Sequence, residues 1–483
     1  MNQPRFFHRG ALTRTATAIG VVLVSAGCAS TAIDDNFTEA RDRTRQSVAA
    51  DVRWLTSGES LRQAQVDVDA LLSHPLDVEG AVRIALAYSP ALQAMLYDAA
   101  AKSAAATQSA RLPNPVFAFE RLSRGRGDAR ELEITRTVSL ALLDVLFLPT
   151  RLRLAEAQQR AIRLDLAGTV VDAAIDARRA WVEAVAAQQS LQYVEQVKAA
   201  ADASAELARR MLAAGNFSRL QRAREQAFAA DAVARLARAR QATRESREAL
   251  VRILGLDARQ ATALVLPDRL PDLPSTVRDE APVLQAAMDQ RLDVQAARAN
   301  LSLVAREQGL SRITSVVNGL ELGLVSLSET GEGTYKGFDV DLPLPIFDFG
   351  DARRAQAQAL YMAALQRTAQ LAVDAGSQVR ERHGAYRTAH DLARHYRDEI
   401  VPLRRTISEE NLLRYNGMLI GVFELLADAR EQIATVSEAI EAQRDFWLAD
   451  AALNAALIGR PIGSRATRSD SRAAPATTTG AGH

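Results

Sequence analysis

The chain has 483 residues and a formal net charge of +1, because 59 lysines and arginines face 58 aspartates and glutamates. This balance gives no electrostatic basis for nucleic-acid binding. Hydrophobic residues make up 48% of the chain but aromatic residues only 5%. Such a composition favours long helices in close contact over a compact catalytic core. We therefore predict a protein that is not an enzyme.

The first 27 residues are typical of a secretory signal peptide, with a basic start and a short apolar run over 16–27. The run ends on Cys28, the only cysteine. The sequence SAGC resembles a bacterial lipobox, although Ser25 stands where an aliphatic residue is usual. We expect a covalent lipid on Cys28; the alternative is an ordinary signal peptide with an incidental cysteine.

Beyond Cys28, no segment reaches 18 uncharged apolar residues, and the nearest, 138–148, contains Asp144. The mature chain therefore has no predicted membrane-spanning helix. If it crosses a membrane, it must do so with β-strands.

An internal duplication organises the rest of the chain. LQA at 92–94 aligns with VQA at 294–296, and Gly215 aligns with Gly417, both at an offset of 202 residues (294 − 92 and 417 − 215). Each repeat is predicted to hold a helix, a β-hairpin and a long helical hairpin. The predicted segments are the linker 28–75, repeat 1 (76–280; first helix 78–111, β-hairpin 114–140, helical hairpin 151–255), repeat 2 (281–463; first helix 283–312, β-hairpin 319–344, helical hairpin 350–459) and a disordered tail (464–483).

The second strand of each β-hairpin alternates apolar and polar residues. Residues predicted to share the apolar faces are Leu132, Ile134, Val138 and Leu140 in one hairpin, and Phe338, Val340, Leu342 and Leu344 in the other. Arg136 interrupts the first pattern, and Asp339 and Asp341 alternate with the second. Strands of this length with an apolar outer face suit a membrane barrel, with the two aspartates facing its lumen.

Four strands cannot close a barrel, because open edges in lipid leave backbone groups unpaired. The chain is therefore expected to oligomerise. Two copies would give eight strands and three would give twelve, and the residues alone leave both numbers open.

The long helices are predicted over 151–212 and 352–414, and Pro402 should kink or split the second. Each hairpin must reverse direction within a few residues. Gly215 and Gly417 are therefore predicted to adopt the positive φ of a helix cap.

Three stretches resemble the TolC-like outer-membrane factor family: LPNP at 112–115, PLPIFDFGDARRAQAQA at 343–359 and YNGMLIGVFELLADAREQ at 415–432. The resemblance implies a mainly α trimer, with a twelve-stranded barrel in the Gram-negative outer membrane and a helical tunnel in the periplasm. It also implies a passive exit duct, docked through a periplasmic adaptor (a membrane fusion protein) to an inner-membrane pump.

By this resemblance, the two helical turns are candidate docking sites for the adaptor. The candidates are Gly215, Asn216, Phe217, Ser218, Tyr415, Asn416, Gly417, Met418 and Leu419. We expect Phe217, Met418, Leu419 and Ile420 to be exposed apolar side chains at the turns. The alternative is that the glycines are caps without a further role.

Residues beside the second turn are candidates for a periplasmic gate. Glu424 and Asp428 are four residues apart on one helix, so they share a face that could ring a narrow tunnel. Arg414 and Tyr415 could pair across a closed tip. The alternative for the two acids is a solvated helix surface.

No catalytic group or metal site is predicted. His383, His390 and His395 lie on one predicted helix at spacings of seven and five, unlike a two-histidine metal face, and are expected to be solvated. No cofactor is expected apart from the lipid. A rival hypothesis is a lipid-anchored periplasmic helical scaffold without a channel.

Overall fold

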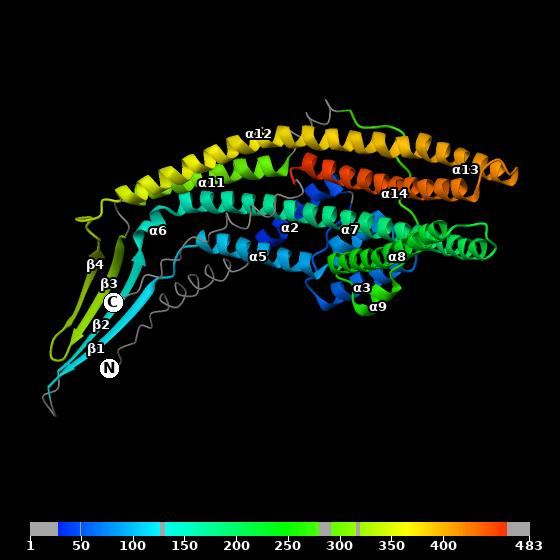
Figure 1. Cartoon of the computed structure of the whole chain (residues 1–483). Helices are drawn as coiled ribbons and strands as arrows, with labels where there is room; N and C mark the ends of the chain where they lie inside the picture. Colours follow the sequence, from blue (N-terminus) through cyan, green and yellow to red (C-terminus); the bar gives the residue numbers. More distant parts are fainter. Residues whose placement is uncertain (1–27, 49, 126–130, 280–290, 315–318, 461–483) are drawn as a thin grey trace. The chain divides into compact units, whose positions relative to one another are not determined.

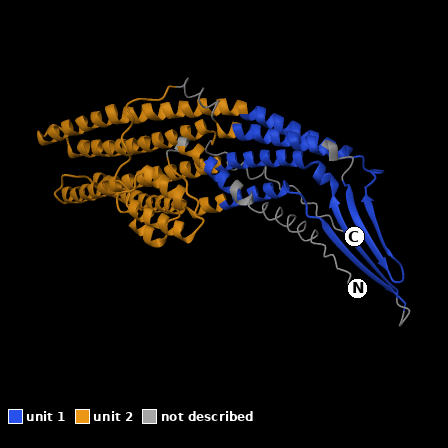
Figure 2. Ribbon diagram, turned by 180° about the vertical axis from the view of Figure 1, so that it is seen from behind, with its two compact units in different colours: residues 1–40, 97–166, 295–371 blue, residues 41–96, 167–294, 372–483 orange. Residues whose placement is uncertain are grey.

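The computed structural model describes residues 28–48, 50–125, 131–279, 291–314 and 319–460 (Figure 1). The expected signal peptide and the expected disordered tail lie outside these residues. The chain divides into two compact units, which Figure 2 colours separately. Unit 1 comprises 1–40, 97–166 and 295–371, and unit 2 comprises 41–96, 167–294 and 372–483.

A four-stranded antiparallel sheet belongs to unit 1. Its strands are β1 (Val116–Arg124), β2 (Glu131–Ala141), β3 (Glu321–Glu329) and β4 (Thr334–Asp341). The order is β1-β2-β3-β4, so pairing of β2 with β3 joins the hairpins of the two repeats (Figure 1). The two predicted hairpins are confirmed.

Helices make up most of the remaining described chain. They are α2 (Cys28–Val48), α3 (Gly58–Leu72), α4 (Val78–Tyr88), α5 (Pro90–Ser109), α6 (Leu142–Leu146), α7 (Leu148–Ala213), α8 (Arg219–Leu254), α9 (Ala258–Ala263), α11 (Leu292–Thr314), α12 (Asp351–His395), α13 (Val401–Asn416) and α14 (Val422–Ile458). At 1.5 Å per residue, the 66 residues of α7 span about 100 Å. The mainly α class and the doubled helix–hairpin–helix plan are confirmed.

The repeats end alike. Helix α8 closes on Gly255 and helix α14 closes on Gly459, with φ of 72° and 81°. Both glycines are left-handed C-caps, a conformation that residues with a Cβ rarely adopt. The short sequences ILGL (253–256) and ALIG (456–459) thus both end the returning helix of their helical hairpin with a glycine cap.

Two predicted helices are interrupted. The helix expected over 78–111 is split between α4 and α5 at Ser89, because Pro90 fixes its own φ and restricts the residue before it. Between α12 and α13, residues Tyr396–Ile400 form a π-helical turn directly before Pro402. The predicted interruption at Pro402 is confirmed, and it takes the form of a locally widened helix.

Small apolar side chains line the buried face of α7 in unit 2. Ala167, Val171, Ala174 and Ala177 are all almost fully buried. Their spacing of three and four residues places them on one stripe, and the alanines allow neighbouring helices to approach closely. Among the described helices, none combines the length and hydropathy needed to cross a membrane.

Candidate functional site: the sheet faces and the helical turns

The sheet has two chemically different faces. In an antiparallel ladder, paired residues share a face and alternate residues change face. The continuous register places odd-numbered residues of β1 with even-numbered residues of β2, β3 and β4 on one side, which we call the apolar face. The remaining strand residues form the opposite side, which we call the carboxylate face.

The apolar face carries two adjacent rows of exposed hydrophobic side chains. The rows are Phe117–Val138–Leu324–Phe338 and Leu140–Leu322–Val340. Phe338 is 74% exposed. The alternation predicted for β2 and β4 is therefore confirmed, and β1 and β3 contribute to the same rows. Such a contiguous patch marks an interaction surface.

The carboxylate face carries seven acids and one arginine, a formal net charge of −6. These residues are Glu120, Glu131, Glu133, Glu321, Glu329, Asp339, Asp341 and Arg124. Asp339 and Asp341 lie opposite the apolar rows, as predicted. The segregation of charge is therefore a property of all four strands.

Strands β1 and β4 are the edges of the sheet, since each has one strand neighbour among the described residues. Edge strands present unpaired N–H and C=O groups that can pair with another chain. The sheet therefore has two kinds of surface that another molecule would cover: its exposed apolar face and its two open edges.

The turn between α7 and α8, in unit 2, satisfies its own backbone groups. Gly215 has a φ of 78°, and the backbone N–H groups of Asn216 and Phe217 donate to the carbonyl of Met211. Ser218 caps α8 in a reciprocal capping box with Gln221. The prediction of positive φ at Gly215 is confirmed.

The turn between α13 and α14 is less regular. Gly417 has a φ of −80°, so the prediction of positive φ there is wrong. The left-handed position is one residue later, at Met418, with a φ of 60°. There the backbone N–H of Leu419 bonds to the carbonyl of Arg414 at 2.8 Å, which sets the reversal. A non-glycine residue with this φ carries local strain.

The exposure of the candidate docking residues differs between the two turns. Met418 is 93% and Leu419 is 77% exposed, as predicted, whereas Ile420 is half-buried. Phe217 is only 6% exposed, so its expected exposure is wrong. Its ring stacks on Phe423 at a centroid distance of 4.7 Å.

Phe217 belongs to a small core between the two helical hairpins. Ala208, Phe217 and Val422 form its buried centre. Met211, Leu212, Phe423 and Leu426 pack around it. The two turns, 205 residues apart at Phe217 and Val422 (422 − 217), are thus held together by apolar contact.

A buried ion pair also links the two hairpins. Glu225 of α8 is 1% exposed; it accepts a hydrogen bond from Ser204 of α7 at 2.6 Å and pairs with Arg430 of α14. The Arg430 guanidinium lies over the ring of Phe228 at 4.9 Å. Three helices are therefore joined at one carboxylate, whose charge would be costly without these partners.

The candidate gate residues are in different surroundings. Glu424 is exposed, but Asp428 is buried, and its Oδ2 has no hydrogen-bond partner among the described residues. The alternative that both are solvated is therefore wrong for Asp428. The side chains of Arg414 and Tyr415 are exposed, and neither contacts the other in a hydrogen bond or ion pair within the described chain. A gating role stays a prediction.

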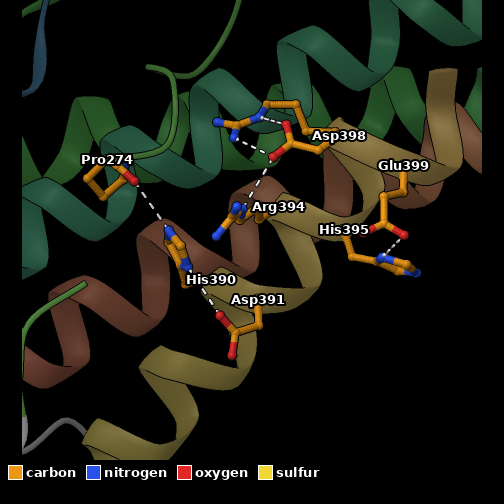
Figure 3. Close-up of polar contacts among 8 residues, drawn as sticks. Pro274, His390, Asp391, Arg394, His395, Asp398 and Glu399 are labelled. Atoms are coloured by element: carbon orange, nitrogen blue, oxygen red, sulfur yellow. Dashed lines mark hydrogen bonds and ion pairs between the residues drawn. The ribbon is translucent and has the colours of Figure 1, made fainter. Parts of the chain in front are cut away.

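Two of the three helix α12 histidines are buried, which corrects the expectation that all are solvated. His383 bonds to the carbonyl of Arg278 at 2.9 Å. His390 bonds to the carbonyl of Pro274 at 3.2 Å (Figure 3). His395 is exposed and pairs with Glu399 on the next turn (Figure 3).

The buried histidines therefore fasten the extended segment before residue 279 to α12. That segment is neither helix nor strand, so its backbone carbonyl groups have no ladder partner, and side-chain groups bond to them instead. The described residues contain no group of three His, Cys, Asp or Glu side chains placed to hold a metal ion.

Burial also perturbs one acid of α14. Burial raises the pKa of Asp450, and this effect exceeds the opposing attraction of Arg278, whose guanidinium lies 2.7 Å away. Asn454 donates a further hydrogen bond to the same carboxylate. Asp450 therefore becomes charged at a higher pH than a solvated aspartate would.

Sequence reasoning missed the Glu225–Arg430 pair and the Phe217–Phe423 stack. Both lie between segments about 200 residues apart, and no local pattern distinguishes them from surface helix residues. Only the duplication, which aligns the two turns, could have suggested that the turns meet. The side chain of Cys28 lies outside the described side chains.

Comparison with solved structures identifies the fold. The CmeC outer-membrane channel of Campylobacter jejuni matches with a TM-score of 0.64 at 14% identity, over 86% of this chain and 89% of that chain. The outer-membrane protein VceC of Vibrio cholerae matches with a TM-score of 0.65 at 15% identity, over 83% and 99%.

The open-state MtrE outer-membrane channel of Neisseria gonorrhoeae gives a TM-score of 0.57 at 17% identity, over 80% of this chain and 89% of that chain. A scan against protein-family models finds no match, and neither does a search of curated protein sequences. The chain therefore has the fold of these outer-membrane channels, and at 14–17% identity the likeness establishes the fold.

Proposed function

We propose that three copies of this chain form a passive exit channel in the outer membrane. The observation that carries the proposal is the sheet, which combines an exposed apolar face, a carboxylate face and two open edges. Lipid would cover the first face, water the second, and neighbouring copies the edges. The fold shared with outer-membrane channels supports the same conclusion.

The strand directions permit closure. Because the four strands alternate, β4 of one copy runs antiparallel to β1 of the next, so every added copy extends the same ladder. Two copies give eight strands and three give twelve. The resemblance to TolC-like factors favours three.

The carboxylate face would then line the pore. With a net charge of −6 per chain on this face, three copies give the lumen wall a net charge of about −18. Such a wall attracts cations and repels anions. The channel itself supplies no energy, which in this proposal comes from an inner-membrane pump joined through a periplasmic adaptor.

Conductance of the purified full chain in planar bilayers tests the channel. We expect discrete conductance with a potassium preference over chloride, measured by the reversal potential in a salt gradient. Asp339→Asn with Asp341→Asn should lower that preference, because both carboxylates lie on the lumen side. Lys336→Gln, on the apolar face, is the matched control and should leave it unchanged.

Absence of conductance would contradict the channel, and an equal effect of the two variants would contradict the assignment of the faces. Fractionation tests the rival scaffold hypothesis. A channel should fractionate with the outer membrane and run as a heat-labile trimer in detergent. A scaffold would be released as a soluble monomer when its lipid anchor is cleaved.

Docking on the adaptor is supported by the exposed side chains of Met418 and Leu419. A photo-reactive residue at Leu419 should crosslink, in cells, to a periplasmic protein with a helical hairpin. The same residue at Leu403, which is 63% exposed on α13, is the control. Equal crosslinking at both positions would contradict docking at the turn.

Lipidation of Cys28 is part of the same proposal. The intact mass of the mature protein should exceed that of the chain starting at Cys28 by a diacylglyceryl and an acyl group. Cys28→Ser should remove this difference. An unmodified mass would show that the cysteine is incidental.

A further inference from the structure

The apolar face carries three cations and no acid. Its ionisable residues are Arg121, Arg136 and Lys336, and all three are exposed. None of them has a side-chain hydrogen bond or ion pair within the part of the chain that the structure describes. The opposite face holds seven acids, so the signs of charge are almost completely separated between the two faces.

The three cations occupy two adjacent rows of the apolar face. Arg136 and Lys336 occupy the row Phe119–Arg136–Ser326–Lys336, on either side of Ser326 and about 10 Å apart across two strand spacings. Arg121 lies in the next row, paired with Ile134. All three are on the hairpin side of the row Phe117–Val138–Leu324–Phe338.

This order matches a lipid leaflet. Acyl chains would cover the two apolar rows, and the two rows that hold the cations follow about 7 Å and about 14 Å further along the strands. A charged side chain facing lipid is costly at the membrane midplane and tolerated near the interface. The cations therefore mark the depth at which headgroups begin.

We propose that Arg121, Arg136 and Lys336 bind phosphate groups of lipid headgroups on the outside of the sheet. This inference rests on the proposed placement of the apolar face in the outer membrane. Guanidinium groups form paired hydrogen bonds with phosphate, and ammonium groups attract it as point charges. The neighbouring hydrophobic rows favour a phosphate that is attached to acyl chains over a free anion.

Native mass spectrometry of the full-length trimer in neutral detergent tests the proposal. The probes are diphosphoryl lipid A and monophosphoryl lipid A, which differ by one phosphate, with inorganic phosphate as competitor. We expect tighter binding of the diphosphoryl form and no competition by inorganic phosphate. Equal binding of the two lipids, or competition by millimolar inorganic phosphate, would overturn the proposal.

Substitutions to serine test which residues form the site. Serine is chosen because Ser326, between Arg136 and Lys336, shows that this face accommodates it. Arg136→Ser and Lys336→Ser should each weaken binding of diphosphoryl lipid A about fivefold, and the triple variant with Arg121→Ser about a hundredfold. Arg124→Ser is the matched control, because it removes a cation from the opposite face of the same sheet. Equal weakening by Arg124→Ser would overturn the assignment.

The heat-labile trimer is measured in parallel on every variant. A wild-type chain that never forms it contradicts the proposed channel, whereas a normal trimer with no phosphate preference contradicts only the lipid site. If a serine variant fails to assemble, Arg136→Lys keeps the test decisive. That variant should assemble and retain most of the binding, and complete loss would contradict recognition by charge.

Discussion

The two helical turns perform the same reversal with different means. The first, at Gly215, uses a glycine in the left-handed region, a reciprocal capping box and a buried phenylalanine. The second places Met418 in the left-handed region and begins α14 after Gly421, which has no side-chain cap. The first turn is locally satisfied, whereas the second is strained and presents apolar side chains to solvent.

This difference indicates that the two turns have different roles. The first turn packs Phe217 against the second hairpin and supports it. The second turn, against which Phe217 packs, exposes the side chains of Met418 and Leu419 to solvent. Backbone strain and exposed apolar groups persist where surrounding structure holds them, and they are common at binding surfaces. The following variants test the comparison, with local stability measured by amide hydrogen exchange in α7, α8 and α14.

Phe217→Ala should have the largest effect. Removal of a buried aromatic ring leaves a cavity against Phe423, and we expect the free energy of local opening to fall by about 3 kcal/mol. Met418→Ala is the control and should change it by less than about 0.5 kcal/mol, because the side chain is exposed. Similar losses in both variants would remove the distinction between the turns.

Arg430→Met should reduce the free energy of local opening by about 2 kcal/mol, because it leaves the buried Glu225 carboxylate without its cation. The expected loss is below that for a fully buried pair, since Arg430 is partly exposed. Arg235→Met, which breaks the exposed pair with Asp231 on α8, should cost less than about 0.5 kcal/mol. Protection should fall in both hairpins; a loss confined to α14 would contradict the link.

Gly215→Ala should destabilise the first turn by about 1–2 kcal/mol, because alanine resists a φ of 78°. Gly417→Ala should change the second turn by less than about 0.5 kcal/mol, since its φ is −80° and a Cβ would meet only ordinary contacts. The same hydrogen-exchange experiment distinguishes them. A larger loss at Gly417 would contradict the assignment of the left-handed position to Met418.

Cap exchanges should have the smallest effects. Ser218→Ala removes the cap of α8 and should reduce its opening free energy by about 1 kcal/mol. Gly421→Ser adds a cap to α14 where the backbone is already extended and a Cβ meets open space, so it should gain a few tenths of a kcal/mol. A destabilised Gly421→Ser variant would mean that this turn needs glycine for another reason.

The regular elements were readable from sequence because their causes are local. Period-two alternation located β2 and β4 to within about three residues, and Pro402 marked the break after α12. The duplication indicated the order of elements in both repeats. The split at Pro90 has an equally local cause, and the proline alone could have predicted it.

The candidate site was less predictable because its contacts are distant in sequence. Phe217 looked like an exposed turn residue until α14 was placed beside it. His383 and His390 looked solvated until the segment at 274–278 covered them. Met418 took the left-handed position because the bond from Leu419 to Arg414 fixed the reversal one residue beyond the glycine.

The π-helical turn at Tyr396–Ile400 has a consequence for how the second turn is aimed. A π turn contains one residue more than an α turn, so it shifts the phase of everything that follows by about 100° around the helix axis. Deleting a single amino acid there would remove the extra residue and its phase shift together, so the uninterrupted α-helix would present Met418 and Leu419 at the same azimuth. The same deletion within α13, where no extra residue is stored, would instead rotate that surface by about 100° without altering any residue on it.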